Sequence, residues 1–242
     1  MPNVNFPTQS AQKVSPLWPS LHALADEGSL YIATSTSVAS GQAAGTGIAT
    51  TTSVVDDAAT ASATHAQNVP VMYVANKAGN TDPNARSIYP LWLRMLCTAA
   101  PTSATFWNWA IRADAVPRYT SGGTLCAPIN VNTNSGQISN AQIYFGAVVT
   151  ANLPSSQQRV LGSGAVQSSI PVVKDLWTFT FGDMTAPTNI LTASGAKNLT
   201  IPCGPIVLAP GWNFVLEMWG ASNAGAPAWE FEFGYAERQS GL

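Results

Sequence analysis

Three segments of the chain alternate between apolar, mostly aromatic side chains and polar ones with a period of two residues. They are Thr105–Arg112, Asp175–Phe181 and Ala228–Gly234. Successive side chains of a β-strand point to opposite faces of a sheet, so this period predicts strands with one aromatic face and one polar face. Two sheets made of such strands bury their aromatic faces against each other. The alternation therefore predicts a β-sandwich.

The rest of the chain fits the same class. Segments rich in β-branched and aromatic residues recur between turn-forming groups, and no window keeps a helical period over more than about two turns. The predicted strands are Leu30–Thr34, Ile48–Val55, Pro70–Asn76, Leu91–Ala99, Ala104–Asp114, Ala141–Ala151, Arg159–Val166, Val172–Phe181, Leu199–Leu208, Trp212–Ala221 and Ala228–Glu237. We expect one all-β domain, an antiparallel sandwich over residues 29–242.

The first 28 residues form a separate region that is punctuated by prolines. These are Pro2, Pro7, Pro16 and Pro19. Proline fixes an extended backbone and cannot donate to a sheet, so residues 1–28 are predicted to be an extended N-terminal arm. Ser20–Glu27 is expected to close the arm with one or two helical turns that end at Gly28. The isolated apolar residues of the arm suit either a groove of a neighbouring subunit or an open edge of the same sandwich, and the sequence leaves both open.

The composition indicates a protein that packs against other proteins. Only 9% of the residues are charged, against about 25% in ordinary soluble domains, and 46% are hydrophobic. The surface is therefore expected to consist mainly of uncharged polar residues, which lose little hydration free energy in a contact. Self-association is the natural inference, although a monomeric protein with a neutral surface has the same composition.

The charge pattern and the hydropathy exclude other classes. The net charge is −2 and no run of Lys or Arg occurs, so direct binding to nucleic acid is not expected. No stretch approaches the eighteen apolar residues that span a membrane, and the first ten residues lack the features of a secretory signal. We expect a protein that is made soluble, is not exported through a cleaved leader and binds no membrane.

One segment carries a resemblance to a known class of proteins. In Ile206–Trp219 a strand meets a turn at Pro210 and Gly211 and returns as an alternating strand, and a last aromatic-rich strand follows. This order resembles the C-terminal half of viral jelly-roll proteins. The character of the chain from Leu91 to Arg238 is similar to tailed-bacteriophage virion proteins of the capsid decoration or cement class.

The resemblance implies a jelly-roll-like sandwich that has no catalytic activity and needs no cofactor. It also implies a homotrimer that lies on the capsid surface and contacts the major capsid protein. Because the resemblance includes no diagnostic motif, it assigns no residue. The contacts are expected instead in the arm and in the Ala/Thr-rich tract that follows the first strand. The candidate interface residues are Phe6, Leu17, Trp18, Gln42 and Ile48.

Two other functions use different residues. Eight tryptophans suit a receptor- or glycan-binding module of a phage tail or fibre, although most of them alternate with polar residues as core residues do. A glycan hydrolase would use Glu230 and Glu232 on one strand face, joined by Glu217, but the ExDxxE spacing of jelly-roll glycosidases is absent. Solvent-facing or interfacial glutamates explain this pattern with fewer assumptions.

No metal or cofactor site is expected. The three cysteines, Cys97, Cys126 and Cys203, form no CxxC pair, and two of them lie in apolar stretches where a free thiol behaves as a small hydrophobe. The two histidines, His22 and His65, have no ligand partner at a suitable spacing.

Overall fold

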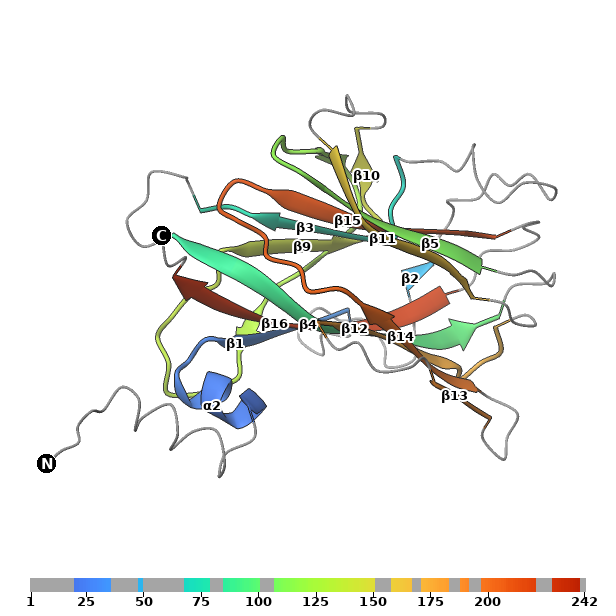
Figure 1. Cartoon of the computed structure of the whole chain (residues 1–242), viewed down its shortest axis with the longest axis horizontal. Coiled ribbons are helices and arrows are strands. Elements are labelled where there is room, and N and C mark those ends of the chain that lie inside the picture. Colours follow the sequence, from blue (N-terminus) through green and yellow to red (C-terminus); the bar gives the residue numbers. More distant parts are fainter. Residues whose placement is uncertain are drawn as a thin grey trace, which may run out of the picture.

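The structure is a computed structural model of the 242-residue chain, and it describes residues 20–35, 48–49, 68–78, 85–100, 107–150, 158–166, 171–182, 188–191, 197–220 and 228–239. The described residues form one helix and two large sheets that lie face to face (Figure 1). The helix is α2 (Ser20–Asp26). Because all the other described elements are strands, the expected all-β class is confirmed.

The strands of the eight-stranded sheet are, in spatial order, β13 (Thr188–Leu191), β14 (Lys197–Cys203), β12 (Leu176–Phe181), β4 (Arg86–Ala99), β16 (Ala228–Gln239), β1 (Leu30–Thr34) and β8 (Ile129–Asn130), with β2 (Ile48–Ala49) also paired to β16. The six-stranded sheet has the order β11 (Gln158–Val166), β5 (Trp107–Asp114), β15 (Asn213–Gly220), β3 (Met72–Asn76), β9 (Ala141–Phe145) and β7 (Thr124–Cys126). A two-stranded sheet joins β10 (Val148–Val149) to β6 (Tyr119–Ser121).

The pairing of eight of these strands is nested. The first pairs with the last, β1 with β16, and the next pairs inward are β3 with β15, β4 with β12, and β5 with β11. All four pairs are antiparallel, and successive pairs belong to alternate sheets. A long antiparallel ribbon that is rolled in this way is a jelly roll, so the predicted jelly-roll-like sandwich is confirmed by the strand order itself.

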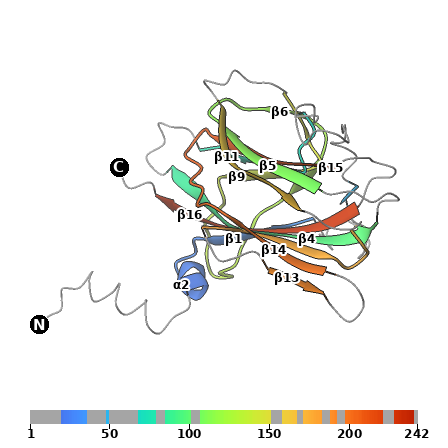
Figure 2. The ribbon, with the colours of Figure 1, turned by 45° about the vertical axis from the view of Figure 1, so that its right-hand side comes forward.

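Aromatic side chains from the two sheets form the centre of the core. Three pairs join one sheet to the other: Phe145 with Phe231 at 4.3 Å between ring centroids, Trp109 with Phe179 at 5.5 Å, and Phe214 with Phe233 at 6.2 Å. All six side chains are buried in one hydrophobic cluster. The aromatic faces predicted from the alternation therefore do meet, and Figure 2 shows the two layers that they join.

Some boundaries differ from the prediction. β4 begins at Arg86 and runs through Pro90, five residues before the expected start. β12 begins only at Leu176, because the Asp175 carboxylate accepts a hydrogen bond from the Val172 amide and closes a turn. Strands β6, β7, β8 and β13 were not predicted; each has two to four residues, too few to show a period. β14 also runs parallel to β12, a departure from the expected antiparallel sandwich.

The segment between β5 and β11 covers part of the outer face of the six-stranded sheet. Its strands β6 and β10 lie on the side of that sheet that faces away from the eight-stranded one (Figures 1 and 2). Tyr73 and Val215 point outward from the sheet and pack with Ala147 and Val149 in a second buried cluster. This face is therefore occupied by the chain itself.

Two buried ion pairs accompany this second cluster. Arg118 lies 3.3 Å from Asp114, both with fully buried side chains, and Arg112 is paired with Glu217. Burial raises the pKa of Asp114 above 3.8, although the charges of Arg118 and Arg112 oppose this rise. Charged groups at these depths need partners, and each pair supplies one.

Gly234 of β16 is a close-packed point on the outer face of the eight-stranded sheet. A β-carbon at this position would lie 2.2 Å from the indole of Trp92, which donates a 2.8 Å hydrogen bond to Glu232. Gly136, in contrast, has no atom within 4 Å of an added β-carbon. We expect Gly234→Ala to lower the free energy of unfolding by about 1–3 kcal/mol, because the indole must move.

Urea denaturation of the purified variants measures this effect, with Gly136→Ala as the matched control, expected within about 0.5 kcal/mol of the parent. Adding Trp92→Ala to Gly234→Ala should cost less than the two separate losses together, because the two side chains share one space. Equal losses at Gly234 and Gly136 would contradict this account of the packing.

Candidate functional site

The described fold begins with a segment that is fixed to the sandwich by side chains far away in the sequence. We call residues 20–29 the arm root. Asn132 donates a 3.1 Å hydrogen bond to the carbonyl of Asp26, and Asn130 donates one of 2.8 Å to the carbonyl of Gly28. The predicted helical turns are confirmed as α2, which ends before Gly28. The first described segment of the chain is therefore held in position on the sandwich.

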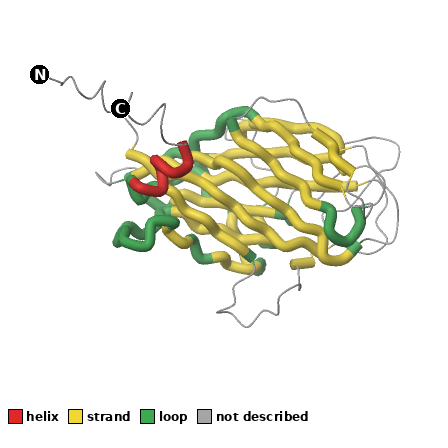
Figure 3. Tube along the Cα trace, turned by 90° about the horizontal axis from the view of Figure 1, so that it is seen from below, coloured by secondary structure: helices red, strands yellow, loops and turns green. Residues whose placement is uncertain are grey.

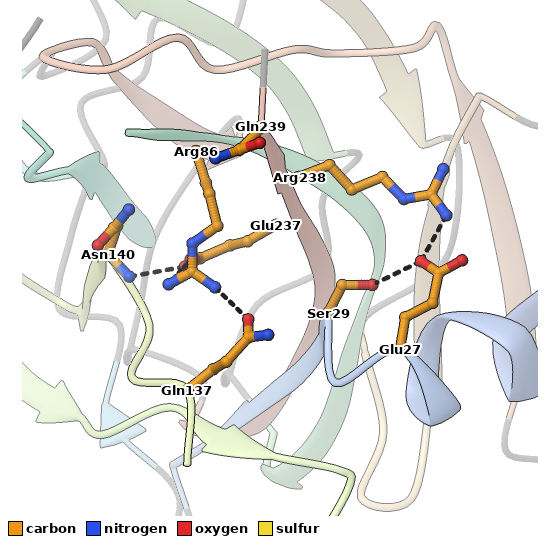
Figure 4. Close-up of a pocket in the computed structure, with 8 residues that line it drawn as sticks. All are labelled: Glu27, Ser29, Arg86, Gln137, Asn140, Glu237, Arg238 and Gln239. Atoms are coloured by element: carbon orange, nitrogen blue, oxygen red, sulfur yellow. Dashed lines mark hydrogen bonds and ion pairs between the residues drawn. The ribbon is translucent and has the colours of Figure 1, made fainter. Parts of the chain in front are cut away.

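A cleft of about 500 Å³ lies beside the arm root. Figure 4 shows its lining, which comes from the end of α2, the start of β4, the end of β16 and the segment before β9. The lining residues are Glu27, Ser29, Arg86, Gln137, Asn140, Glu237, Arg238 and Gln239. Both ends of the described chain meet here, because Glu27 and Ser29 line the cleft together with Arg238 and Gln239 of β16. Figure 3 shows the helix at one end of the strands.

The charges that line the cleft are paired with each other. Glu27 lies 2.6 Å from Arg238, on the solvent side, and Glu237 lies 3.1 Å from Arg86 with its side chain fully buried. The Glu237 carboxylate also accepts hydrogen bonds from the Ser139 hydroxyl at 2.5 Å and the Asn140 amide at 2.8 Å. The cleft thus contains carboxylates that act as structural acceptors, and it ties the two ends of the chain to one loop.

Burial raises the pKa of Glu237 above 4.5, although the Ser139 hydrogen bond and the Arg86 charge act in the opposite direction. Burial also raises the pKa of the Tyr235 hydroxyl, which lies 2.7 Å from the same Ser139 hydroxyl. Burial in the fold therefore disfavours the ionised form of Glu237 relative to a solvent-exposed carboxylate.

The three glutamates of the hydrolase hypothesis do not converge. Glu217 lies on β15 between buried Leu216 and Met218, so it points outward from the six-stranded sheet, where it is paired with Arg112. Glu230 and Glu232 alternate with the core aromatics of β16 and therefore lie on the outer face of the other sheet. The expectation that Glu217 joins the other two is wrong, because the whole core separates them.

The candidate interface residues lie mostly beyond what the structure describes. Phe6, Leu17, Trp18 and Gln42 are outside the described residues, so their roles stay predictions. Ile48 belongs to β2, where its backbone lies opposite Trp229 of β16. β2 thus lies against β16, and the rest of the expected strand to Val55 lies outside the described residues.

The structure adds a set of exposed apolar residues that the sequence did not single out. Leu125, Ile129 and Ile138 are 56%, 68% and 84% exposed, and they lie on β7, on β8 and in the segment after them. Val131 and Leu21 of α2 are also exposed. We call these five residues the β7–β8 rim. Isolated apolar residues among turn formers carry no periodic signal, so only the fold shows that they share one side of the sandwich with the arm root.

Most of the arginines are paired inside the chain. Of the six in the sequence, Arg86, Arg94, Arg112, Arg118 and Arg238 form ion pairs with Asp or Glu of the same chain. The sixth, Arg159, lies over the ring of Trp212 at 4.6 Å. The surface therefore carries even less unpaired charge than the composition indicates, because these arginines and acids neutralise one another.

The cysteines are buried free thiols, as predicted for Cys97 and Cys203. Burial raises the pKa of each of the three thiols to about 12. Within the described ranges, no group of three or more His, Cys, Asp or Glu side chains is arranged to hold a metal ion. Nor does that part of the chain contain a helix long and apolar enough to cross a membrane.

Comparison with known proteins identifies no family for this chain. No family model matches the chain, and no curated protein matches it. Among solved structures, an unassembled pentamer of the KI polyomavirus protein VP1 aligns over 88% of this chain and 92% of that chain, at 12% identity and a TM-score of 0.22. A match at this TM-score carries no argument about the fold, and the jelly roll is identified by the strand order.

The buried Glu237 makes the stability of the fold depend on pH. Its raised pKa means that the folded state holds the proton more tightly than the unfolded chain does, so its contribution to stability falls as the pH rises from 4.5 through the raised pKa. In Glu237→Gln this fall disappears. The difference in the free energy of unfolding between the parent and Glu237→Gln should change by up to about 1.4 kcal/mol per pH unit in that window.

Urea unfolding of both proteins between pH 4 and pH 8 measures the difference. Glu27→Gln is the matched control, because it removes an exposed carboxylate from the same cleft. Parallel stability curves for the parent and Glu237→Gln would contradict the assignment.

Proposed function

We propose that the protein is a non-enzymatic virion structural protein, a decoration or cement protein that stabilises the lattice of a major capsid protein. In this proposal it is made in the host cytoplasm, assembles as a homotrimer and lies on the capsid surface. The observation that carries the proposal is the pairing of charge: a jelly roll in which five of six arginines are neutralised by acids of the same chain.

Weakly charged surfaces suit lattice contacts. A charge that enters a contact must lose its hydration, whereas Ser, Thr, Asn and Gln lose less and pair easily. The β7–β8 rim adds apolar area, since Ile129 and Ile138 are largely exposed. Many weak contacts of this kind add up when they are repeated over a symmetric lattice.

The arm root supports a role for the arm in assembly. Fixing the segment before residue 30 with Asn130 and Asn132 sets the position from which residues 1–19 extend. A flexible attachment would lose more conformational entropy when the arm binds a neighbour, so a fixed root favours binding. The apolar residues Phe6, Leu17 and Trp18 are the proposed anchors.

The absence of catalysis is part of the proposal. Glu217 is buried against Arg112, and it is separated by the core from Glu230 and Glu232. A glycosidase needs two carboxyl groups that flank one bond, at about 5–10 Å from each other. The described acids do not present Glu217 in such a pair with either of the others.

A receptor- or glycan-binding module is the weaker alternative. Stacking on a sugar requires an exposed aromatic face, and Trp109, Trp177 and Trp229 are buried in the core. Most of the tryptophan alternation is thus explained by packing between the sheets. The tryptophan that does not follow this alternation is Trp18 of the arm, which lies outside the described residues.

Removal of residues 1–19 tests the proposal. The deletion stops before Ser20, because α2 is held to the sandwich and has its own contacts there. We expect the full chain to have about three times its 25.3 kDa mass in solution and to bind capsid particles, and the shortened chain to lose at least one of these properties. Light scattering and cosedimentation with particles measure both.

The matched control is a chain that lacks residues 240–242, which removes an end of the chain without touching the arm. This control should keep its mass and its particle binding. A full chain that is monomeric at micromolar concentration and binds no particle would contradict the proposed function.

A further inference from the structure

Strand β11 forms an edge that is unusually long for this fold. It has nine residues, whereas the strands at the other three edges of the two large sheets, β7, β8 and β13, have three, two and four. One side of β11 pairs with β5 from Gln158 to Val166. Within the described part of the chain no strand pairs with its other side, and a sheet edge of this kind presents its outward amides and carbonyls to a further strand.

The residues of β11 do little to block such pairing. Edge strands are commonly protected by charges or proline, but β11 contains no proline, and its single charge, Arg159, lies over Trp212. Val160 is 65% exposed. A bulge occurs between Val160 and Gly162, and the register is regular from Gly162 to Val166.

A buried aromatic side chain packs against one face of β11. An added β-carbon at Gly162 or Gly164 would lie 3.3 Å or 3.0 Å from the indole of Trp109, so this buried ring packs directly under the strand. Because several residues of β11 have small side chains, another backbone can approach this strand closely. Such an edge is a template for β-augmentation, in which backbone hydrogen bonds bind an extended segment.

The arm root and β11 lie on opposite sides of the sandwich. The edge strands β7 and β8 belong to different sheets, but only residues 127–128 separate them in the chain, so they lie on the same side of the sandwich. The arm root is on this side too, because it leads directly into β1, which pairs with β8. β11 is at the other edge of the six-stranded sheet. A contact from an arm to a β11 edge of the next copy joins two different surfaces, which is the head-to-tail geometry that closes into rings.

The arm has the length and the sequence for this contact. Nineteen extended residues reach roughly 60–70 Å, whereas a compact domain of about 220 residues is roughly 45 Å across. Between Pro7 and Pro16 the eight residues Thr8–Ser15 contain no proline and one charge. This is the longest proline-free stretch of the arm, and it is one residue shorter than β11.

We propose that Thr8–Ser15 of a second copy of this chain adds a strand to the open edge of β11. The inference rests on the proposed self-assembly and specifies the surface that receives the arm. The added strand would continue the six-stranded sheet across the subunit boundary, with Phe6 and Trp18 flanking it as side-chain anchors.

Amide hydrogen exchange tests the proposal on the full chain in its assembled state. We expect the outward amides of Gly162–Val166 to exchange about tenfold more slowly in the assembled chain than in the chain without residues 1–19, since each gains a hydrogen bond. Amides of β16 serve as the internal reference for an intact fold. A synthetic peptide of residues 5–18, added to the shortened chain, should restore the protection.

Two full-length variants separate strand pairing from loss of the arm. In the first, Gln9→Pro, Ala11→Pro and Lys13→Pro remove amide donors from the proposed strand and keep the apolar anchors. In the second, Asn3→Pro and Asn5→Pro place prolines outside it. The first should lose the protection of β11 and the second should keep it.

The outcomes distinguish this inference from the proposed function. If the full chain assembles and binds particles but β11 exchanges equally fast in all variants, the β11 proposal is wrong and the proposed function stands. If β11 is protected in a monomer at every protein concentration, the chain's own arm occupies the edge, which overturns the second copy as the occupant. If the full chain neither assembles nor binds particles, both proposals fail.

Discussion

The packing of aromatic rings between the two sheets is the interaction on which the rest of the structure depends. Phe145 on Phe231, Trp109 on Phe179 and Phe214 on Phe233 each join a strand of one sheet to a strand of the other. Burial of such side chains is the main favourable term in folding. It also fixes the register, because a shift of one residue would turn every ring to the outside.

A jelly roll built on this core leaves two outer faces and a few strand edges, and the chain uses them differently. The segment between β5 and β11 folds onto one face, where Tyr73 and Val215 form a second small core and Arg118 is buried against Asp114. On the other face, the Trp92 indole lies over Gly234 and binds Glu232. At the edges, the described residues leave apolar side chains exposed at the β7–β8 rim and on β11.

The ion pairs near the arm root are consistent with this arrangement. The ion pairs at the arm root serve different purposes: Arg238 with Glu27 is exposed and adds little stability, whereas Arg86 with Glu237 is buried and would be costly to break. Together with Asn130 and Asn132, they hold the start and the end of the described chain at one place.

The sequence by itself determined the properties that depend on neighbouring residues. The alternation in 175–181 and 228–234 predicted which side chains enter the core, and Pro210-Gly211 predicted a turn in which Gly211 has a φ of 79° and the Trp212 amide bonds to the Ala209 carbonyl. Only the tertiary structure decided which strands pair, and therefore that Glu217 and Glu230 lie on opposite outer faces and that β11 lies at the edge of the described six-stranded sheet. The reason is physical: the period of a strand is set locally by its own backbone, whereas pairing between β1 and β16 joins residues some two hundred positions apart and depends on the whole chain.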